Sequence, residues 1–291
     1  MAGKVKGFKS RLKNAVIALF PPIKKVVERK TYYEEAYNAL VERLKVIEGD
    51  NPSVVDFGDG LYLRGKNVTF LDEQNFQEAY TAGERSGHNL GNNLNIRWRV
   101  HVALWAASQV RRLPGDFVEC GVSTGILSLA ICKYIDFNNT DKHFYLFDTF
   151  EGIPVEQGAS QEEKAHIQML NDKTFESCYS ITKKNFAPYK NAVLVKGRVP
   201  DTLDTVKIDQ VGYLHIDMNV AKPERDALEF FWPKMVSGGI ILMDDYGLTG
   251  YEAQHAGAND FVEKLNATEA YRENKVMILA LPTGQGLIIK P

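Results

Sequence analysis

Short apolar runs alternate with amphipathic segments through the last two-thirds of the chain. Seven runs have the length and composition of strands, at 117–120, 143–148, 192–196, 211–217, 238–243, 276–281 and 286–290. Helical patterns separate the early runs and follow the fifth, at 126–135, 161–170, 173–185, 224–235 and 256–265. This alternation predicts an α/β, Rossmann-like fold with a mainly parallel seven-stranded sheet. The tight turn at 282–285 predicts a hairpin, and therefore one antiparallel strand.

Further helical periods precede the first of these strands. Apolar residues recur at three- and four-residue steps in 31–48, 74–87 and 96–112, and the last of these is expected to pack on the sheet. Between them, 51–73 contains short apolar pieces and glycines, which predicts a small hairpin or loop. We therefore expect an N-terminal basic and helical extension with a lid region at 1–94, and the main domain at 95–291.

The charge of the chain is nearly balanced but unevenly distributed. The 291 residues carry a formal net charge of −2, which gives no reason to expect a nucleic-acid partner. Three cysteines without metal-ligand spacing favour a reducing, cytoplasmic location. Residues 1–30, however, hold nine Lys/Arg against one acid. This segment is either an element that contacts an anionic membrane surface or a solvated tail.

A glycine turn follows the first predicted strand of the sheet. Residues 116–125 read D-F-V-E-C-G-V-S-T-G, so that the strand ends near Glu119 and the turn holds Gly121, Ser123 and Gly125. In an open α/β sheet such a turn lies beside the ligand. Glu119 would repel a diphosphate but suits an amino group, such as that of a bound amino-acid moiety. Alternatively, the turn is a bare crossover without a ligand.

A second acid ends the next strand. Asp148 is followed by Thr149, and an acid in this place can accept hydrogen bonds from the two hydroxyls of a ribose. Together with Glu119 it would anchor the two ends of a nucleoside-like cofactor. The alternative for Asp148 is a structural turn or capping residue.

Three aspartates follow the fourth and fifth strands. Asp217 ends the fourth, and Asp244 and Asp245 end the fifth. Because the carboxyl ends of parallel strands converge, these carboxylates could gather around Mg²⁺ or Mn²⁺, which offsets their mutual repulsion. Alternatively, Asp217 caps the next helix and the double aspartate begins a turn.

Residues 95–291 resemble the macrocin and mycinamicin O-methyltransferase family in the order and spacing of several pieces. These are residues 115–122 (GDFVECGV), 147–154 (FDTFEGIP), 196–203 (KGRVPDTL), 215–217 (HID), 232–234 (WPK), 238–239 (GG) and 244–247 (DDYG). The resemblance implies a class I methyltransferase fold, S-adenosylmethionine as cofactor and a sugar acceptor. It also implies Asp217, Asp244 and Asp245 as metal ligands, and we include Arg198, within the third piece, among the cofactor-binding residues.

The fourth strand departs from the family pattern. The macrolide enzymes usually read Asp-Gly-Asp-Leu-Tyr there, whereas this chain reads D-M-N-V-A, with Asn219 and Ala221 at the second acid and the tyrosine. The lysine of catechol methyltransferases, three residues past the first metal aspartate, is Val220 here. The three aspartates implied as metal ligands are all present. The acceptor and the catalytic base, however, can differ from those of the family.

These residues predict an O-methyltransferase that acts on a hydroxyl of a small-molecule sugar or glycan. Asp217 is the first candidate for the proton acceptor and His255 the second, since histidine titrates near neutral pH. We also expect a homo-oligomer. Two alternatives stay open: a metal-dependent nucleotide-sugar glycosyltransferase, and a methyltransferase-like binding module without activity.

Overall fold

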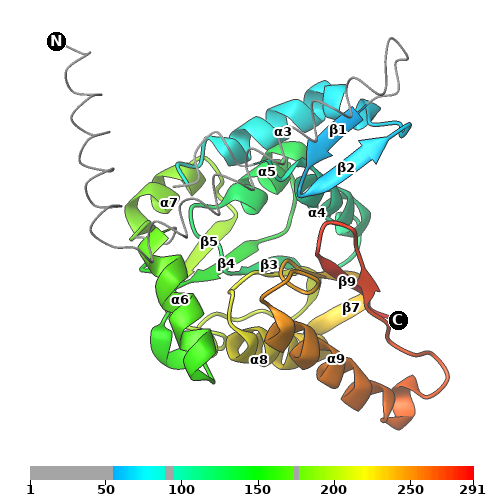
Figure 1. Ribbon diagram of the computed structural model, residues 1–291. Coiled ribbons are helices and arrows are strands. Elements are labelled where there is room, and N and C mark those ends of the chain that lie inside the picture. Colours follow the sequence, from blue (N-terminus) through cyan, green and yellow to red (C-terminus); the bar gives the residue numbers. More distant parts are fainter. Residues whose placement is uncertain (1–54, 89–94, 174–176) are drawn as a thin grey trace, which may run out of the picture. The chain divides into compact units, whose positions relative to one another are not determined.

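The computed structural model of the chain describes residues 55–88, 95–173 and 177–291 (Figure 1). The predicted seven-stranded sheet is present, in the order β5-β4-β3-β6-β7-β9-β8. Strand β9 is antiparallel to both of its neighbours, and the other pairs are parallel. The bounds are β3 Asp116–Cys120, β4 Phe144–Asp148, β5 Ala192–Lys196, β6 Val211–Ile216, β7 Met235–Met243, β8 Leu279–Ala280 and β9 Gly286–Ile289. The predicted fold class is therefore confirmed.

Helices cover both faces of this sheet (Figure 1). The α-helices are α3 Gln74–Glu84, α4 Arg97–Val110, α5 Ile126–Tyr134, α6 Gln161–Lys173, α7 Tyr179–Phe186, α8 Ala221–Phe231 and α9 Glu252–Asn266. Short 3₁₀ turns are η1 Thr69–Asp72, η3 Phe137–Asn139, η4 Val155–Gln157, η5 Trp232–Lys234 and η6 Glu269–Tyr271.

Two hydrophobic clusters pack against opposite faces of the sheet. Successive strand residues point to opposite faces, so Phe117 and Tyr213 pack with α3, α4 and α5, whereas Val118 and Leu214 pack with α8 and α9. Both clusters include fully buried residues. This two-sided burial explains why the strands are apolar without a polar alternation.

Several predicted bounds shift in the structure. The helix expected at 224–235 begins at Ala221 instead, and its Pro223 falls in the first turn, where a missing N–H costs nothing. The strand expected at 276–281 shortens to Leu279–Ala280. In the helix expected to pack on the sheet, Trp105 of α4 is 44% exposed. The helix predicted at 31–48 lies outside the described residues.

Contacts within the chain group it into two units. One comprises residues 1–55 with 63–67, and the other comprises residues 56–62 with 68–291. A two-stranded sheet, β1 Val55–Gly58 and β2 Leu61–Arg64, is the hairpin expected within 51–73, and its turn belongs to the second unit. The predicted boundary at 94/95 stays a prediction. In the described ranges, none of the helices combines the length and the apolar composition that a membrane span requires.

Candidate active site

A cavity of about 320 Å³ opens at the carboxyl ends of four adjacent strands. Its lining includes the five acids predicted from sequence: Glu119 from β3, Asp148 from β4, Asp217 after β6, and Asp244 and Asp245 after β7. The sheet brings them together because β4, β3, β6 and β7 are consecutive neighbours. Five carboxylates around one cavity make it strongly acidic, a surface suited to cationic groups.

The glycine turn is held against the end of β6. Gly121 has φ +92°, and a Cβ at this position would collide with the carbonyl group of Asp217. Ser123, which lines the cavity, also has positive φ, at 49°. Gly125 has φ +94° as the N-cap of α5, but it does not line the cavity. Only glycine fits at Gly121, since both the backbone angle and the close approach exclude a side chain.

Asp148 joins this turn to the loop after β4. Its Oδ2 accepts hydrogen bonds from the backbone N–H groups of Val122 and Ser123, both at 2.7 Å, and its Oδ1 accepts one from Phe150 at 2.6 Å. Thr149 also lines the cavity, and its hydroxyl donates to the carbonyl of Gly152. The Thr149 hydroxyl also lies 3.4 Å from Oδ1 of Asp148. Asp148 therefore has a structural role, and it also lines the cavity.

Glu119 and His215 form a buried pair behind the cavity. Oε1 of Glu119 lies 3.0 Å from Nδ1 of His215, and Nε2 of His215 lies 4.0 Å from Oδ1 of Asp244. Burial lowers the pKa of His215, but Asp244 and Glu119 outweigh it and raise the pKa to about 10. Oε2 of Glu119 is buried without a hydrogen-bond partner among the described residues. Glu119 thus has one oxygen paired with His215 and one without a partner in the described part of the chain.

The three aspartates differ in their surroundings. Despite burial, Arg99 and His215 hold the pKa of Asp244 well below its usual range. Burial first, and then the charges of Asp244 and Asp245, raise the pKa of Asp217. Burial, Glu224 and Asp244 likewise raise the pKa of Asp245.

This donor set fits a divalent cation. Oδ2 of Asp245 is buried and lacks a hydrogen-bond partner within the described ranges. One ligand atom each from His215, Asp217 and Asp244 lies within 4.8 Å of the others. Asp217 and Asp244 of the predicted ligand set belong to this compact group; Asp245 lines the cavity beside it. Oxygen ligands of this kind suit Mg²⁺ or Mn²⁺. A cation would offset the charge repulsion that, after burial, raises the pKa values of Asp217 and Asp245.

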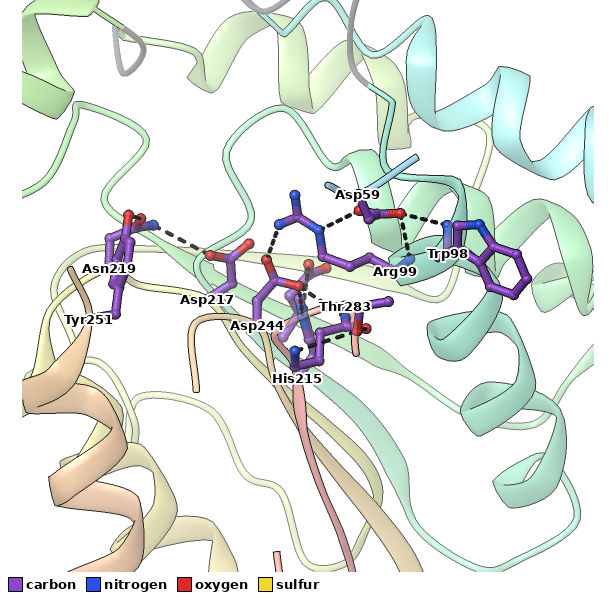
Figure 2. A network of polar contacts seen from close by, with 11 residues as sticks. Asp59, Trp98, Arg99, His215, Asp217, Asn219, Asp244, Tyr251 and Thr283 are labelled. Atoms are coloured by element: carbon purple, nitrogen blue, oxygen red, sulfur yellow. Dashed lines mark hydrogen bonds and ion pairs between the residues drawn. The ribbon is translucent and has the colours of Figure 1, made fainter. Parts of the chain in front are cut away.

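Arg99 brings a positive charge into the cavity, and no pattern in the sequence singled it out. Its Nη1 donates to Oδ2 of Asp244 at 2.7 Å, and its Nε donates to Oδ1 of Asp59 at 2.8 Å (Figure 2). Gln285 donates to the other oxygen of Asp244 at 3.0 Å. Asp59 and Gln285 lie far from Asp244 in sequence, so only the folded chain reveals these contacts.

The departure from the family pattern also lies in the cavity. Asn219 has φ +60°, and its Nδ2 lies 3.4 Å from Oδ1 of Asp217. The hydroxyl group of Tyr251 donates to Oδ1 of Asn219 at 2.8 Å (Figure 2). Tyr251 and Asn219 both line the cavity, beside the candidate base.

Two predicted site residues lie elsewhere. Arg198 is exposed and pairs with Glu156 at 3.0 Å and Asp201 at 2.8 Å, outside the cavity lining. His255 is exposed on α9, with Nδ1 2.9 Å from the carbonyl oxygen of Tyr246 and its ring tilted by 32° against the ring of that tyrosine. The roles predicted for both residues stay predictions.

The fold is that of an O-methyltransferase. The solved structure of the O-methyltransferase NovP matches with a TM-score of 0.58 at 20% identity, covering 69% of this chain and 82% of that one. Residues 98–273 match the family model for macrocin O-methyltransferase (TylF), which covers more than half of the chain. The chain belongs to the macrocin O-methyltransferase family, as its motifs indicated.

Two curated relatives each match about half of this chain. Demethyldecarbamoylnovobiocin O-methyltransferase of Streptomyces niveus is 31% identical over 143 residues, which is 46% of this chain and 53% of the relative. The 8-demethyl-8-(2,3-dimethoxy-alpha-L-rhamnosyl)-tetracenomycin-C 4'-O-methyltransferase of Streptomyces olivaceus is 26% identical over 143 residues, 47% of this chain and 54% of the relative. The chain thus spans about half the length of these relatives.

Proposed function

We propose that this protein transfers a methyl group from S-adenosylmethionine to a hydroxyl of a sugar or glycan, with a divalent cation bound in the same cavity. The observation that carries the proposal is the gathering of five carboxylates from four neighbouring strand ends around one cavity. Membership of the macrocin O-methyltransferase family supports methyl transfer. A relative whose name specifies methylation of a rhamnosyl group supports a sugar acceptor.

The cofactor would lie along β3 and β4. Oε2 of Glu119 has no hydrogen-bond partner among the described residues, so it is available to the cofactor's amino group. Asp148 and Thr149 line the same cavity and suit the ribose hydroxyls. Gly121 and Ser123 bring the backbone of the turn close to the ligand. S-adenosylmethionine supplies an electrophilic methyl group on a sulfonium, whose positive charge suits this acidic cavity.

The acceptor would lie toward β6 and β7, where the three aspartates are. When bound, a divalent cation supplies a Lewis acid that lowers the pKa of an acceptor hydroxyl. Asp217, Asp244 and Asp245 would hold that cation, and they would thereby fix the acceptor for in-line attack. Asp217 lies beside Asn219 at the cavity wall and is our candidate for the proton acceptor. His255 ranks second, because it does not line the cavity.

A nucleotide-sugar substrate is less well supported. A diphosphate requires several cationic groups, and Arg99 is the one lysine or arginine among the described lining residues. Its guanidinium already pairs with Asp59 and Asp244. A thermal-shift comparison of S-adenosylhomocysteine with UDP-sugars separates the two functions, since the methyltransferase should be stabilised by the first ligand alone.

Metal removal is the experiment that tests the proposal. With radiolabelled S-adenosylmethionine and a panel of glycosides bearing vicinal hydroxyls, EDTA should abolish methyl transfer and Mg²⁺ should restore it. The affinity for S-adenosylhomocysteine should stay nearly unchanged, because the cation contacts the acceptor and not the cofactor. Asp244→Asn should reproduce the chelated state with a cooperative thermal transition. Full activity in EDTA would refute the metal mechanism, and loss of cofactor binding would show that the acids organise the fold instead.

A further inference from the structure

We propose that Asp59 and Arg99 form a bridge that positions Asp244 for cation binding, so that the β1–β2 turn contributes to the active site. This inference rests on the proposed function, in which Asp244 is a ligand of the divalent cation. Asp59 lies outside residues 98–273, which match the family. The bridge therefore adds a component that the family match does not contain.

Asp59 is built into the start of helix α4. Its side chain is 0% exposed, and its Oδ2 accepts hydrogen bonds from the backbone N–H groups of Trp98 at 2.7 Å and Arg99 at 3.2 Å. Ile96, the N-cap residue of α4, provides no side-chain cap, so Asp59 replaces it from another element. The backbone N–H of Asp59 also donates to the carbonyl of Asn95 at 2.9 Å. These contacts fix the carboxylate in position and direction.

Arg99 connects the fixed carboxylate of Asp59 to Asp244. Its Nε and Nη1 donate to Asp59 and Asp244 at 2.8 and 2.7 Å, so one planar guanidinium connects the two carboxylates (Figure 2). A lysine has a single charged nitrogen and cannot reproduce this fork. On the other side, Gln285 donates to Oδ1 of Asp244 at 3.0 Å. Asp244 is thus held through both oxygens, and its remaining lone pairs stay available to a cation.

The bridge has a defined consequence for the cation site. Partners that orient a metal ligand typically contribute about ten- to hundredfold in metal affinity. Arg99 lines the cavity next to Asp244, whereas Asp59 acts at one remove. Both are positioning residues in this proposal. Loss of Arg99 or Asp59 should release Asp244 from one fixed orientation without removing a ligand of the cation.

Mn²⁺ binding to the full-length protein, measured by calorimetry, tests the bridge apart from activity. Arg99→Gln and Asp59→Asn should each weaken Mn²⁺ binding by about tenfold to hundredfold, with S-adenosylhomocysteine affinity within about twofold of the unaltered protein, since binding terms without a shared contact are independent. Arg99→Lys should restore only part of the loss, because it keeps the charge and loses the fork. Combining Arg99→Gln with Asp59→Asn should be no worse than Arg99→Gln alone, since both act by one route.

Arg97 offers a matched control on the same helical turn. It donates to Asn95 at 2.9 Å and does not line the cavity, so Arg97→Gln should leave Mn²⁺ affinity unchanged. If the unaltered protein does not bind Mn²⁺, the metal part of the proposed function fails. If it binds Mn²⁺ and both Arg99→Gln and Asp59→Asn bind equally well, the bridge is refuted. Should Asp59→Asn lose stability, Arg99→Lys decides, and an Mn²⁺ affinity equal to that of the unaltered protein refutes the bridge.

Discussion

The acids of the cavity differ at the level of single residues, although all come from strand ends. Asp244 accepts hydrogen bonds from Arg99 and Gln285 and has a lowered pKa. Asp217 and Asp245 are buried near other acids and have raised pKa values. The surroundings of Asp244 favour its ionised form, and an added positive charge would favour the ionised forms of Asp217 and Asp245. This difference favours the binding of a cation between the three carboxylates.

Replacing Asp148 by alanine should weaken S-adenosylhomocysteine binding by about ten- to hundredfold. A lost charged hydrogen bond to a ribose hydroxyl costs about 1.5–3 kcal/mol. The alanine also leaves the N–H groups of Val122 and Ser123 without their acceptor, which lowers the melting temperature. Calorimetry gives the affinity and a thermal melt gives the stability. An unchanged affinity would remove Asp148 from the cofactor site.

Glu224 gives the protein without bound metal a pH-dependent stability. Burial first, and then the charge of Asp217, raise the pKa of Glu224 from 4.5 to about 8, although the N–H of Met218 opposes the shift. The folded state thus holds this proton more tightly than the unfolded state, so the contribution of Glu224 to stability is fully present below pH 4.5 and is lost as the pH rises through about 8. Glu224→Gln should flatten this decline in thermal melts at constant ionic strength. An equally steep decline in the variant would contradict the assignment.

At the scale of elements, the turn between β3 and α5 and the loop after β6 depend on each other. The N–H of Asp217 donates to the carbonyl of Cys120 at 2.8 Å, and Gly121 lies against the carbonyl of Asp217. The backbone contact between this turn and Asp217 therefore joins the two sides of the cavity that we assign to the cofactor and to the acceptor. A change in the turn should disturb both ligands.

Gly121→Ala should destabilise the fold and abolish S-adenosylhomocysteine binding. Positive φ and a collision with backbone together cost about 2–3 kcal/mol or more. Gly257→Ala is the matched control, because Gly257 lies within α9 with open space around it. Alanine there should stabilise the helix by about 0.5–1 kcal/mol. Chemical denaturation measures both, and equal effects of the two substitutions would contradict the close approach.

At the scale of the molecule, the described elements supply the predicted cofactor-binding residues. Glu119, Asp148 and the glycine turn all lie within residues 116–148. The basic segment at 1–30 lies outside the described residues, and its membrane contact stays a prediction. The cofactor site and this segment can therefore be tested separately.

Deleting residues 1–30 should leave S-adenosylhomocysteine affinity unchanged in calorimetry. If the segment contacts membranes, the intact protein should sediment with anionic vesicles and the deletion should abolish this, because each basic residue contributes about 1 kcal/mol near such a surface. Neutral vesicles are the control. Absence of sedimentation by the intact protein would favour a solvated tail.

The sequence by itself determined the fold class and most of the acids of the site. Apolar runs and glycine turns depend on local periodicity, and residues that end parallel strands must meet at one edge of the sheet. For this reason Glu119, Asp148, Asp217, Asp244 and Asp245 were found from their places at strand ends, and the structure brings them together.

Tertiary structure alone decided which groups surround these acids. Arg99 from helix α4 and Gln285 from the turn before β9 donate to Asp244, and Asp59 from the β1–β2 turn holds Arg99. No spacing in the sequence connects these residues. Conversely, His255 follows Asp244 and Asp245 closely in sequence, but it lies on α9 outside the cavity lining. Side-chain contacts over such distances depend on how elements pack, whereas strand ends are fixed by the topology of the sheet.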